Sequence, residues 1–428
     1  CLTLLPTAAL ADETGGTGAS GEAAQMPAYS SGSGTINDPW LISSVEDLQL
    51  LASTINDGSA AEFDADRTGT GEGIPGNYHG YYFKQTTDLD LSSIENWDPI
   101  GYSGGCYFAG HYDGGGYTIS NATSTGKNDD EGYATAGIFG WVAFGSVKNL
   151  TVKNADFFAE GNNNMSYAGG VLAVAYSCTV ENCSVYNSKI ESRRDPNDNS
   201  NYAGGITGIA FDSSFEKCAS VKNTIRHGSF GGGFIGAPDE GDSNFTNCYV
   251  ANCIVTGYSD AGYNTTLSGG FQGASIGGNA ILKSCFVYDC AAQPDPTSKG
   301  EDYFAVFTPN TQFGKVVVTS CVYYYDANDA TVNADGAVSK TVDEFADGTV
   351  ANALGDAFAQ GKLYPVFATD PADYTEVDAA IAKANTLNKD NYKDFSAVEA
   401  AVNAVVRDKK IAEQPAVDAM AEAIEHAI

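Results

Sequence analysis

Five similar segments decide the fold of this chain. They are AGIFGWV (136–142), GGVLAVA (169–175), GGITGIA (204–210), GGFIGAP (232–238) and GGFQGAS (269–275). The second residue of each segment is glycine, and successive glycines lie 33, 35, 28 and 37 residues apart. A second kind of block follows each segment and then occurs once more, as VKNLTV (147–152), VENCSV (180–185), FEKCASV (215–221), FTNCYV (245–250), LKSCFV (282–287) and VTSCVYY (318–324). Such self-similarity indicates a repeat architecture.

Each repeat contains three short strand-like runs. The third run is an apolar patch that follows the second block at Phe157-Phe158, Ile190, Ile225 and Ile254-Val255. Short strands with this period suit a solenoid in which each repeat is one coil and equivalent residues stack about 4.8 Å apart. A propeller needs four strands per blade, and the pattern of leucine-rich repeats is absent. We therefore predict a mainly β protein, a right-handed parallel β-helix whose glycines supply positive φ and close backbone approach at the corners.

The composition excludes several classes of function. The 428 residues include 22 Lys and Arg against 54 Asp and Glu, a formal net charge of −32. Binding to nucleic acid or to an anionic membrane surface needs clustered cations, so neither is an expected partner. The 43% of hydrophobic residues suffice for a core. No stretch approaches the ~18 apolar residues of a transmembrane helix.

The first residues have the pattern of an export signal. CLTLLPTAALA (1–11) is apolar and ends in a small-x-small tripeptide, which predicts a signal-peptide remnant cleaved after Ala11. A lipidated Cys1 is the alternative, but the apolar run directly after it argues against that interpretation. Residues 12–33 are interpreted as a flexible segment. We expect an extracellular protein at the bacterial cell surface, and a chain that is part of a longer, anchored one.

Residues 372–428 change to a helical pattern. Apolar residues recur there at helical spacing, at Val377, Ile381, Ala384, Val398, Val402, Val405, Val417, Met420 and Ile424. Ser396, with Glu399 three residues later, predicts the capping box of the middle helix. Three short amphipathic helices pack as a small bundle. The pattern resembles the FIVAR module of large bacterial surface proteins, which implies a spacer or a ligand-binding unit.

The repeat segments also carry a resemblance. AGIFG, GGITG, GGFIG and GGFQG share a Gly-x-hydrophobic-x-Gly pattern, and GGVLA departs from it with Ala173 at the closing position. They resemble the GLUG motif of bacterial surface proteins and of some immunoglobulin-cleaving metalloproteases. Residues 34–56, with Ser43 or Ser44 as a helix cap, and residues 340–367 resemble the flanks of those repeats. The resemblance implies one β-helix domain with capping segments over 34–367. It implies no particular activity, because the motif occurs on proteins of several functions.

Ten cysteines in an exported protein would ordinarily predict disulfides. One repeat position, however, holds cysteine five times, at Cys183, Cys218, Cys248, Cys285 and Cys321, and two further equivalents follow at Cys253 and Cys290. Stacked equivalents lie about 4.8 Å apart, outside the roughly 3.5–4.5 Å between Cβ atoms in a disulfide. We expect a ladder of buried thiols, with disulfides as the alternative. A metal site is not expected, because C-x₄-C spacing places two thiols on opposite faces of a continuous strand.

Catalytic motifs are missing from the sequence. The four histidines are His79, His111, His227 and His426, and neither H-E-x-x-H nor G-x-S-x-G occurs. Because H-E-x-x-H is missing, the zinc-protease domain that some GLUG proteins carry is not expected here. The segment GHYDG (110–114) is interpreted as a turn, not as an acid–base pair.

Acidic clusters are interpreted in the same way. They occur at 129–131, 195–198 and 239–242, between strand runs, and are interpreted as solvated turns. Weak Ca²⁺ binding at DPNDNSN (195–201) is the alternative, against which the adjoining Arg193 and Arg194 argue. We therefore assign no catalytic, cofactor-binding or metal-ligating residue, and no cofactor other than this Ca²⁺ alternative.

Aromatic residues suggest where a partner would bind. Alternation from the inward cysteines places five aromatic side chains on the outer face, at Tyr186, Tyr249, Phe286, Tyr288 and Tyr324. They form an exposed binding stripe, or segment 340–367 covers them; both interpretations stay open. The residues that bind a ligand are not identified.

The expected function is non-enzymatic. We predict adhesion or surface display, with an extracellular glycan or protein bound along the solenoid. The alternatives are a carbohydrate-active β-helix enzyme, either a polysaccharide lyase or a glycoside hydrolase, and an accessory stalk of a larger surface enzyme.

The thiol ladder makes a direct prediction. Without Cys1 the chain holds nine cysteines, and buried unpaired thiols should all react once the protein is unfolded. Titration of the denatured, unreduced protein with a thiol reagent is expected to count nine. A count of two or fewer contradicts the ladder and favours disulfides.

Overall fold

The computed structural model describes residues 29–59, 77–162, 164–193, 200–258, 265–293, 295–309, 314–325 and 336–428. They belong to two compact units. One extends to Thr319 and includes Tyr325–Ala337, and the other comprises Ser320–Tyr324 and Val338–Ile428. The predicted signal remnant and most of the 195–201 loop lie outside the described residues.

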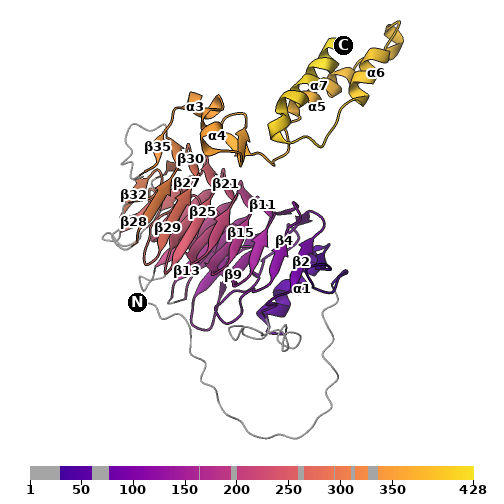
Figure 1. The fold of residues 1–428 in the computed structure, drawn as a ribbon. Coiled ribbons are helices and arrows are strands. Elements are labelled where there is room, and N and C mark those ends of the chain that lie inside the picture. The colour runs from indigo at the N-terminus through magenta and orange to yellow at the C-terminus, as the bar shows by residue number, and fades with distance from the viewer. Residues whose placement is uncertain are drawn as a thin grey trace, which may run out of the picture. The chain divides into compact units, whose positions relative to one another are not determined.

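The first unit is a parallel β-solenoid, as the repeats predict (Figure 1). Five sheets run along it. Sheet 1 contains β1 (Trp40–Ile42), β2 (Tyr82–Gln85), β4 (His111–Asp113), β10 (Ser146–Lys148), β15 (Thr179–Glu181), β20 (Ser214–Glu216), β25 (Asp242–Thr246), β29 (Asn279–Lys283) and β33 (Val316–Thr319). Within this unit, sheet 2 contains β3 (Leu89–Asp90), β5 (Thr118–Ser120), β11 (Thr151–Lys153), β16 (Ser184–Tyr186), β21 (Ala219–Val221), β26 (Tyr249–Ala251) and β30 (Phe286–Tyr288).

Three further sheets complete the coils. Sheet 3 contains β6 (Thr123–Ser124), β12 (Asp156–Glu160), β17 (Lys189–Arg193), β22 (Thr224–His227), β27 (Ile254–Gly257) and β31 (Ala291–Ala292). Sheet 4 contains β7 (Lys127–Asn128), β8 (Ala134–Ala136), β13 (Ser166–Gly169), β18 (Asn201–Gly204), β23 (Phe230–Gly232), β28 (Thr265–Gly269) and β32 (Glu301–Ala305). Sheet 5 contains β9 (Phe139–Ala143), β14 (Leu172–Tyr176), β19 (Thr207–Phe211) and β24 (Ile235–Pro238). Among these strands only the β7–β8 pair is antiparallel.

A full coil has five strands, such as β10 to β14, and the predicted count of three is wrong. The block VKNLTV looks like one run, yet it forms both β10 and β11, with Asn149 between them at φ 54°. A single left-handed residue is enough to turn the chain, so no polar loop marks the corner in the sequence.

The corners also correct the expected role of glycine. Left-handed residues there are mostly not glycine; among them are Asn149, Asn154, Asn182, Asn187, Lys217, Lys222, Asn247, Asn252, Ser284 and Asp289. The repeat glycines do not have positive φ. Asparagine suits such corners because its side chain also hydrogen-bonds locally. Asn182 donates from Nδ2 to Oδ1 of Asn149 (2.9 Å), and Asn149 donates to Oδ1 of Asp113 (2.9 Å), so corner amides form a ladder from coil to coil.

The repeat glycines permit close backbone approach, as expected. A Cβ on the second glycine of each segment would lie 2.0 to 2.7 Å from a carbonyl oxygen of the next coil, at Gly137, Gly170, Gly205, Gly233 and Gly270. A Cβ on the glycine before it would lie 1.9 to 2.2 Å from the carbonyl oxygen three residues later, at Gly169, Gly204, Gly232 and Gly269. The closing glycine has a third neighbour: a Cβ on Gly273 would lie 2.5 Å from the amide nitrogen of Gly231 in sheet 4. Each glycine of the motif thus faces a different backbone.

Aromatic rings and thiols fill the interior in columns. Phe234 stacks on Phe271 with ring centroids 4.7 Å apart, and Phe271 on Phe307 at 5.4 Å. The predicted ladder of buried thiols is present: no disulfide joins the described cysteines, and all of them are buried except Cys106. Cys248 donates its thiol proton to the carbonyl oxygen of Thr246, 3.3 Å away. Burial raises the pKa of Cys248, so the thiol stays protonated.

The C-x₄-C pairs do not lie on opposite faces, which corrects the prediction. Cys248 and Cys253 are both buried, because Asn252 at φ 54° interrupts the alternation between them.

The prediction of an exposed aromatic stripe is wrong for three of its five residues. Tyr249 and Phe286 stack at 4.7 Å and are 1% and 0% exposed, and Tyr288 is buried as well.

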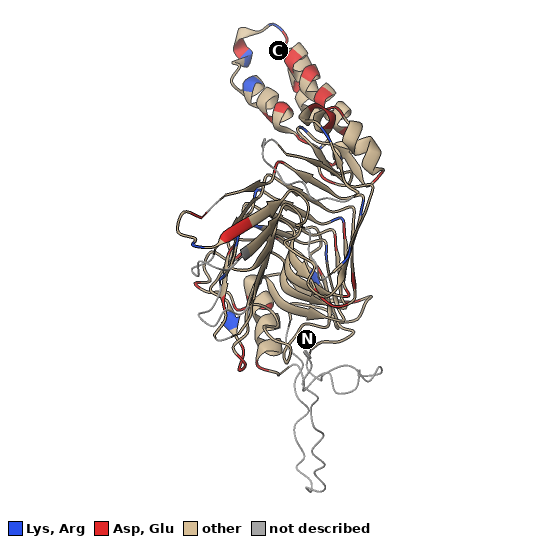
Figure 2. Ribbon diagram, turned by 90° about the vertical axis from the view of Figure 1, so that its left-hand side faces the viewer, with Lys and Arg blue, Asp and Glu red and all other residues tan. Residues whose placement is uncertain are grey.

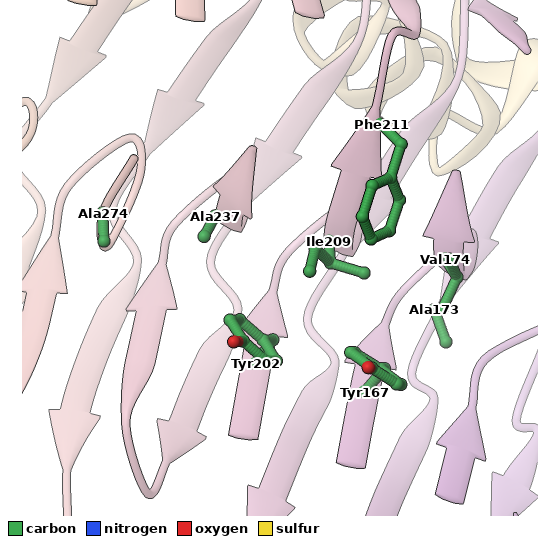
Figure 3. Close-up of a cluster of buried hydrophobic side chains, with 8 residues drawn as sticks. All are labelled: Tyr167, Ala173, Val174, Tyr202, Ile209, Phe211, Ala237 and Ala274. Carbon is green, nitrogen blue, oxygen red and sulfur yellow. The ribbon is translucent and has the colours of Figure 1, made fainter. Parts of the chain in front are cut away.

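A second aromatic column lies on sheet 4 and was not predicted. Tyr167 stacks on Tyr202 and Tyr202 on Phe230, each at 5.4 Å. Figure 3 shows the two tyrosines on neighbouring strands beside Val174 and Ile209 of sheet 5. Tyr167 and Tyr202 are buried, so this column supports the fold.

The second unit contains short strands and most of the helices (Figure 1). Its elements are β34 (Val322–Tyr324), β35 (Val338–Ser339), α3 (Val342–Ala346), α4 (Thr349–Leu354), β36 (Phe358–Gln360), β37 (Pro365–Phe367), α5 (Thr375–Asn385), the 3₁₀ turns η1 (Lys389–Asn391) and η2 (Ile411–Glu413), α6 (Ser396–Asn403) and α7 (Gln414–Ala427). Tyr324 lies against Phe345, with ring centroids 6.4 Å apart. Segment 340–367 therefore covers Tyr324, one of the five aromatic residues of the predicted stripe.

The C-terminal helical region forms as predicted. Val377, Val398, Val417 and Ile424 are buried together between α5, α6 and α7. Ser396 is not the cap of α6: it is the first helical residue, and its amide donates to Oδ1 of Asp394 (2.9 Å). No described helix is long and apolar enough to cross a membrane.

In the first unit, α1 (Val45–Asn56) precedes β2. Ser44 caps this helix, which confirms one of the two predicted alternatives, Ser43 and Ser44. The Ser44 hydroxyl oxygen accepts a hydrogen bond from the amide of Asp47 at 3.2 Å. An N-cap of this kind satisfies one of the free amides at a helix start.

A buried polar network joins sheets 3 and 4. His227 is 1% exposed, and its Nε2 lies 2.8 Å from Oγ of Ser268, which donates to Oδ1 of Asp302 at 2.7 Å. Asp302 also accepts from Thr266 (2.9 Å) and from the amide of Gly257 (3.1 Å). Burial lowers the pKa of His227 to about 4, against a smaller opposing effect of the Asp302 charge. The imidazole is therefore neutral at neutral pH.

The glycine packing predicts a sharp contrast between two substitutions. Gly233→Ala places a Cβ 2.2 Å from the carbonyl oxygen of Gly270, so we expect a loss of about 1–3 kcal/mol in the free energy of unfolding. Gly104→Ala is the control, because its nearest neighbours are Trp141 ring atoms at 4.0 Å. Denaturant unfolding measures the free energy of unfolding of both variants. Equal losses in the two variants would contradict the close-approach role of the repeat glycines.

The His227 network predicts acid sensitivity. Since the folded pKa of about 4 lies below the ordinary value of about 6.5, the unfolded state binds the proton more readily. The contribution of neutral His227 to the free energy of unfolding is fully present above about pH 6.5. It falls as the pH drops towards 4, and about 2–3 kcal/mol is lost at pH 4.5. Unfolding free energies of wild type and His227→Gln at pH 7 and 4.5 test this. The variant should lose less stability on acidification, and parallel losses would refute it.

Candidate functional site

A groove on the outer face of sheet 1 is the strongest candidate site. It has a volume of about 540 Å³. Its floor comes from four neighbouring strands, β2, β4, β10 and β15. The lining residues are Ile36, Asn37, Pro39, Tyr82, Phe83, Lys84, His111, Asp113, Ser146, Val147, Lys148, Thr179 and Glu181.

The parallel register arranges the floor in two columns. One column is Tyr82, His111, Ser146 and Thr179. The other, two residues further along each strand, is Lys84, Asp113, Lys148 and Glu181. The residues between the columns, such as Tyr112 and Val147, are fully buried, so alternation directs both columns outward.

His111 is fixed at the centre of the first column. Its ring stacks on Tyr82, with centroids 4.5 Å apart and planes at 27°. Its Nδ1 lies 2.9 Å from Oγ of Ser146. Partial burial lowers the pKa of His111, and the nearby His79 and Lys148 lower it further. A neutral imidazole held on one side by a hydroxyl can donate or accept a hydrogen bond on the other.

Asp113 has a structural role on the same floor. Its Oδ1 accepts from the amide of Gly115 and from Nδ2 of Asn149, both at 2.9 Å, and Lys148 Nζ lies 3.7 Å from Oδ2. It therefore ends the corner ladder of asparagines. The interpretation of Gly110–Gly114 as a turn is wrong: His111–Asp113 is strand β4, and the bend follows at Gly115 (φ 62°).

A small hairpin forms the rim. The amide of Asp38 donates to the carbonyl oxygen of Thr35, and the amide of Thr35 to that of Asp38, both at 3.1 Å. Ile36 at its tip is 67% exposed. The amide of Tyr82 donates to the carbonyl oxygen of Gly34 at 3.0 Å, which ties the hairpin to β2. The rim adds an apolar contact to a polar floor.

A second groove, of about 640 Å³, lies between α1 and residues 94–98. Its aromatic residue, Trp97, is 2% exposed and donates from Nε1 to the carbonyl oxygen of Ile138. Asp98 and Lys127 are paired at 2.9 Å. With its aromatic side chain buried and these charges paired, this groove presents less to a ligand than the first.

The described residues hold no group of three or more side chains suited to a metal ion. The Asp129 carboxylate accepts from the amides of Glu131 and Tyr133, both at 3.0 Å, as expected for a turn. His227 and Ser268 have nucleophile–base spacing but are 1% and 0% exposed. Figure 2 shows charged residues scattered over the strands and turns of the solenoid.

The sequence prediction assigned no site to the groove: it considered His111 and Asp113, in GHYDG, only to interpret them as a turn, and it missed the other lining residues. Lys148 and Glu181 stand in the repeated blocks VKNLTV and VENCSV, and their shared repeat position was the available signal. Tyr82 and Lys84 belong to a segment without the repeat pattern, so only the folded sheet places them beside His111.

Comparisons with known proteins agree with the fold. No family model matches the chain. Over 148 residues, which are 34% of this chain, the sequence is 30% identical to halomucin of Haloquadratum walsbyi (strain DSM 16790 / HBSQ001). The matched stretch spans about 1% of halomucin's length. The structure resembles that of a "putative immunoglobulin A1 protease" from Bacteroides ovatus, with a TM-score of 0.55 at 18% identity, covering 79% of this chain and 95% of that one. A structure named "IgA1 Protease" gives a TM-score of 0.33 at 13% identity over 78% of this chain and 28% of its own. The likeness to the Bacteroides ovatus structure supports the β-solenoid fold.

Proposed function

We propose that this protein is an adhesin or display protein of the bacterial cell surface, whose solenoid binds an extracellular glycan in the sheet 1 groove. The observation that carries the proposal is the floor itself. Tyr82 and His111 offer ring surfaces and edges, Ser146 and Thr179 offer hydroxyls, and Lys148 and Glu181 offer charges of both signs. A few convergent polar groups beside aromatic and apolar contacts are typical of ligand sites. The acidic composition argues against a nucleic acid as the partner.

A second candidate is an accessory region of a larger surface enzyme. It is favoured by the likeness to a structure described as a putative immunoglobulin A1 protease. H-E-x-x-H and G-x-S-x-G are missing from this sequence, so under this proposal catalysis would belong to another part of the longer protein. Incubation of the chain with immunoglobulin A1 is then expected to leave the antibody intact.

Glycan binding is testable with the intact chain. On an array of extracellular glycans we expect binding without product release, and about a tenfold loss of affinity for Lys148→Ala and for His111→Ala, as for the loss of one good hydrogen bond. Lys283→Ala is the matched control, because Lys283 occupies the same register column on β29, outside the groove. Equal losses in all three variants, or released oligosaccharides, would argue against a binding role for the groove.

A further inference from the structure

We infer, on the basis of the proposed function, that the groove takes an extended, uncharged oligosaccharide that lies along the solenoid axis across four strands. The floor repeats one pair of outward positions on β2, β4, β10 and β15. Three steps of about 4.8 Å between these strands give a floor about 14 Å long. A repeating floor of this length matches a polymer better than a single sugar ring.

The backbone of the floor excludes strand addition by a peptide. A peptide that adds to a sheet needs unpaired amides and carbonyls at an edge. Strands β4, β10 and β15 are paired on both sides, β15 with β20 beyond the groove. Recognition must therefore use side chains alone. Hydroxyl-rich ligands suit Ser146, Thr179 and the neutral ring of His111.

The charges of the floor select against a polyanion. The second column alternates in sign: Lys84, Asp113, Lys148 and Glu181. These formal charges cancel, whereas the whole chain carries −32. An anionic polysaccharide would meet repulsion from the protein without a compensating cationic track. A neutral oligosaccharide meets donors and acceptors along the whole floor.

The two ends of the floor act as distinguishable subsites. Tyr82 and His111 lie on the adjacent strands β2 and β4, whereas Glu181 lies on β15, two strands beyond β4. A disaccharide on the Tyr82–His111 stack does not reach Glu181, and a longer chain does. We therefore expect the contribution of Glu181 to binding to depend on ligand length, and His111 to contribute at every length.

Calorimetric titration with a neutral oligosaccharide series, from two to six sugars, tests this. Affinity should rise with length and level off at about four sugars. Glu181→Gln should weaken the longer ligands about five- to thirtyfold and leave the disaccharide unchanged, whereas His111→Ala should weaken every length. Glu216→Gln is the matched control, because Glu216 pairs with Glu181 in register but lies outside the groove. Unchanged unfolding midpoints show that the variants fold.

Each alternative outcome is distinct. The inference of an extended ligand across four strands is wrong if the disaccharide binds as tightly as the hexasaccharide. It is also wrong if Glu181→Gln weakens the binding of all lengths equally. The proposed glycan binding is retained in both cases. If a sulfated or uronic-acid polymer binds more tightly than the neutral oligosaccharides, only the inference that the ligand is uncharged is wrong. If no glycan of any length binds, the inference and the proposed function fail together.

Discussion

The close backbone approach at the paired glycines is the constraint on which the solenoid depends. At Gly233 even a methyl group would lie 2.2 Å from the carbonyl oxygen of Gly270 in the next coil. Because coils meet there without side chains, they keep the spacing of hydrogen-bonded parallel strands along their whole circumference. The phenylalanine stacks, the thiol ladder and the two columns of the groove all depend on that constant coil-to-coil register.

This constraint explains why the architecture is readable from the sequence. A position that tolerates only glycine repeats visibly, and the period of the glycines reveals the coils. The number of strands is not readable, because the corners use one left-handed residue of varying type, such as Asn149, Lys217 or Ser284. Each corner also resets the inside–outside alternation. Strict alternation therefore failed for Cys248 and Cys253, which are both buried.

The groove illustrates a different limit. Its floor combines residues from the repeat, such as Lys148, with Tyr82 from a strand outside the repeat and with a rim from residues 33–38. Apart from the shared repeat position of Lys148 and Glu181, no local pattern marks these residues, since a lysine or a tyrosine at an outward strand position is ordinary. Only the register of β2 on β4 brings the Tyr82 ring onto His111.

Asp113 connects the architecture to the candidate site. Its carboxylate ends the asparagine ladder through Asn149, and it also lies on the groove floor beside Lys148. Both hydrogen bonds, at 2.9 Å, end on Oδ1 and hold it towards the corner, whereas Oδ2 lies 3.7 Å from Nζ of Lys148. A carboxylate that the fold fixes in this way needs no further ordering when a ligand binds, and it forms an ion pair with Lys148 on the groove floor. Stability of the corner and preorganisation of the floor therefore have one physical origin, the stacking of equivalent residues from coil to coil.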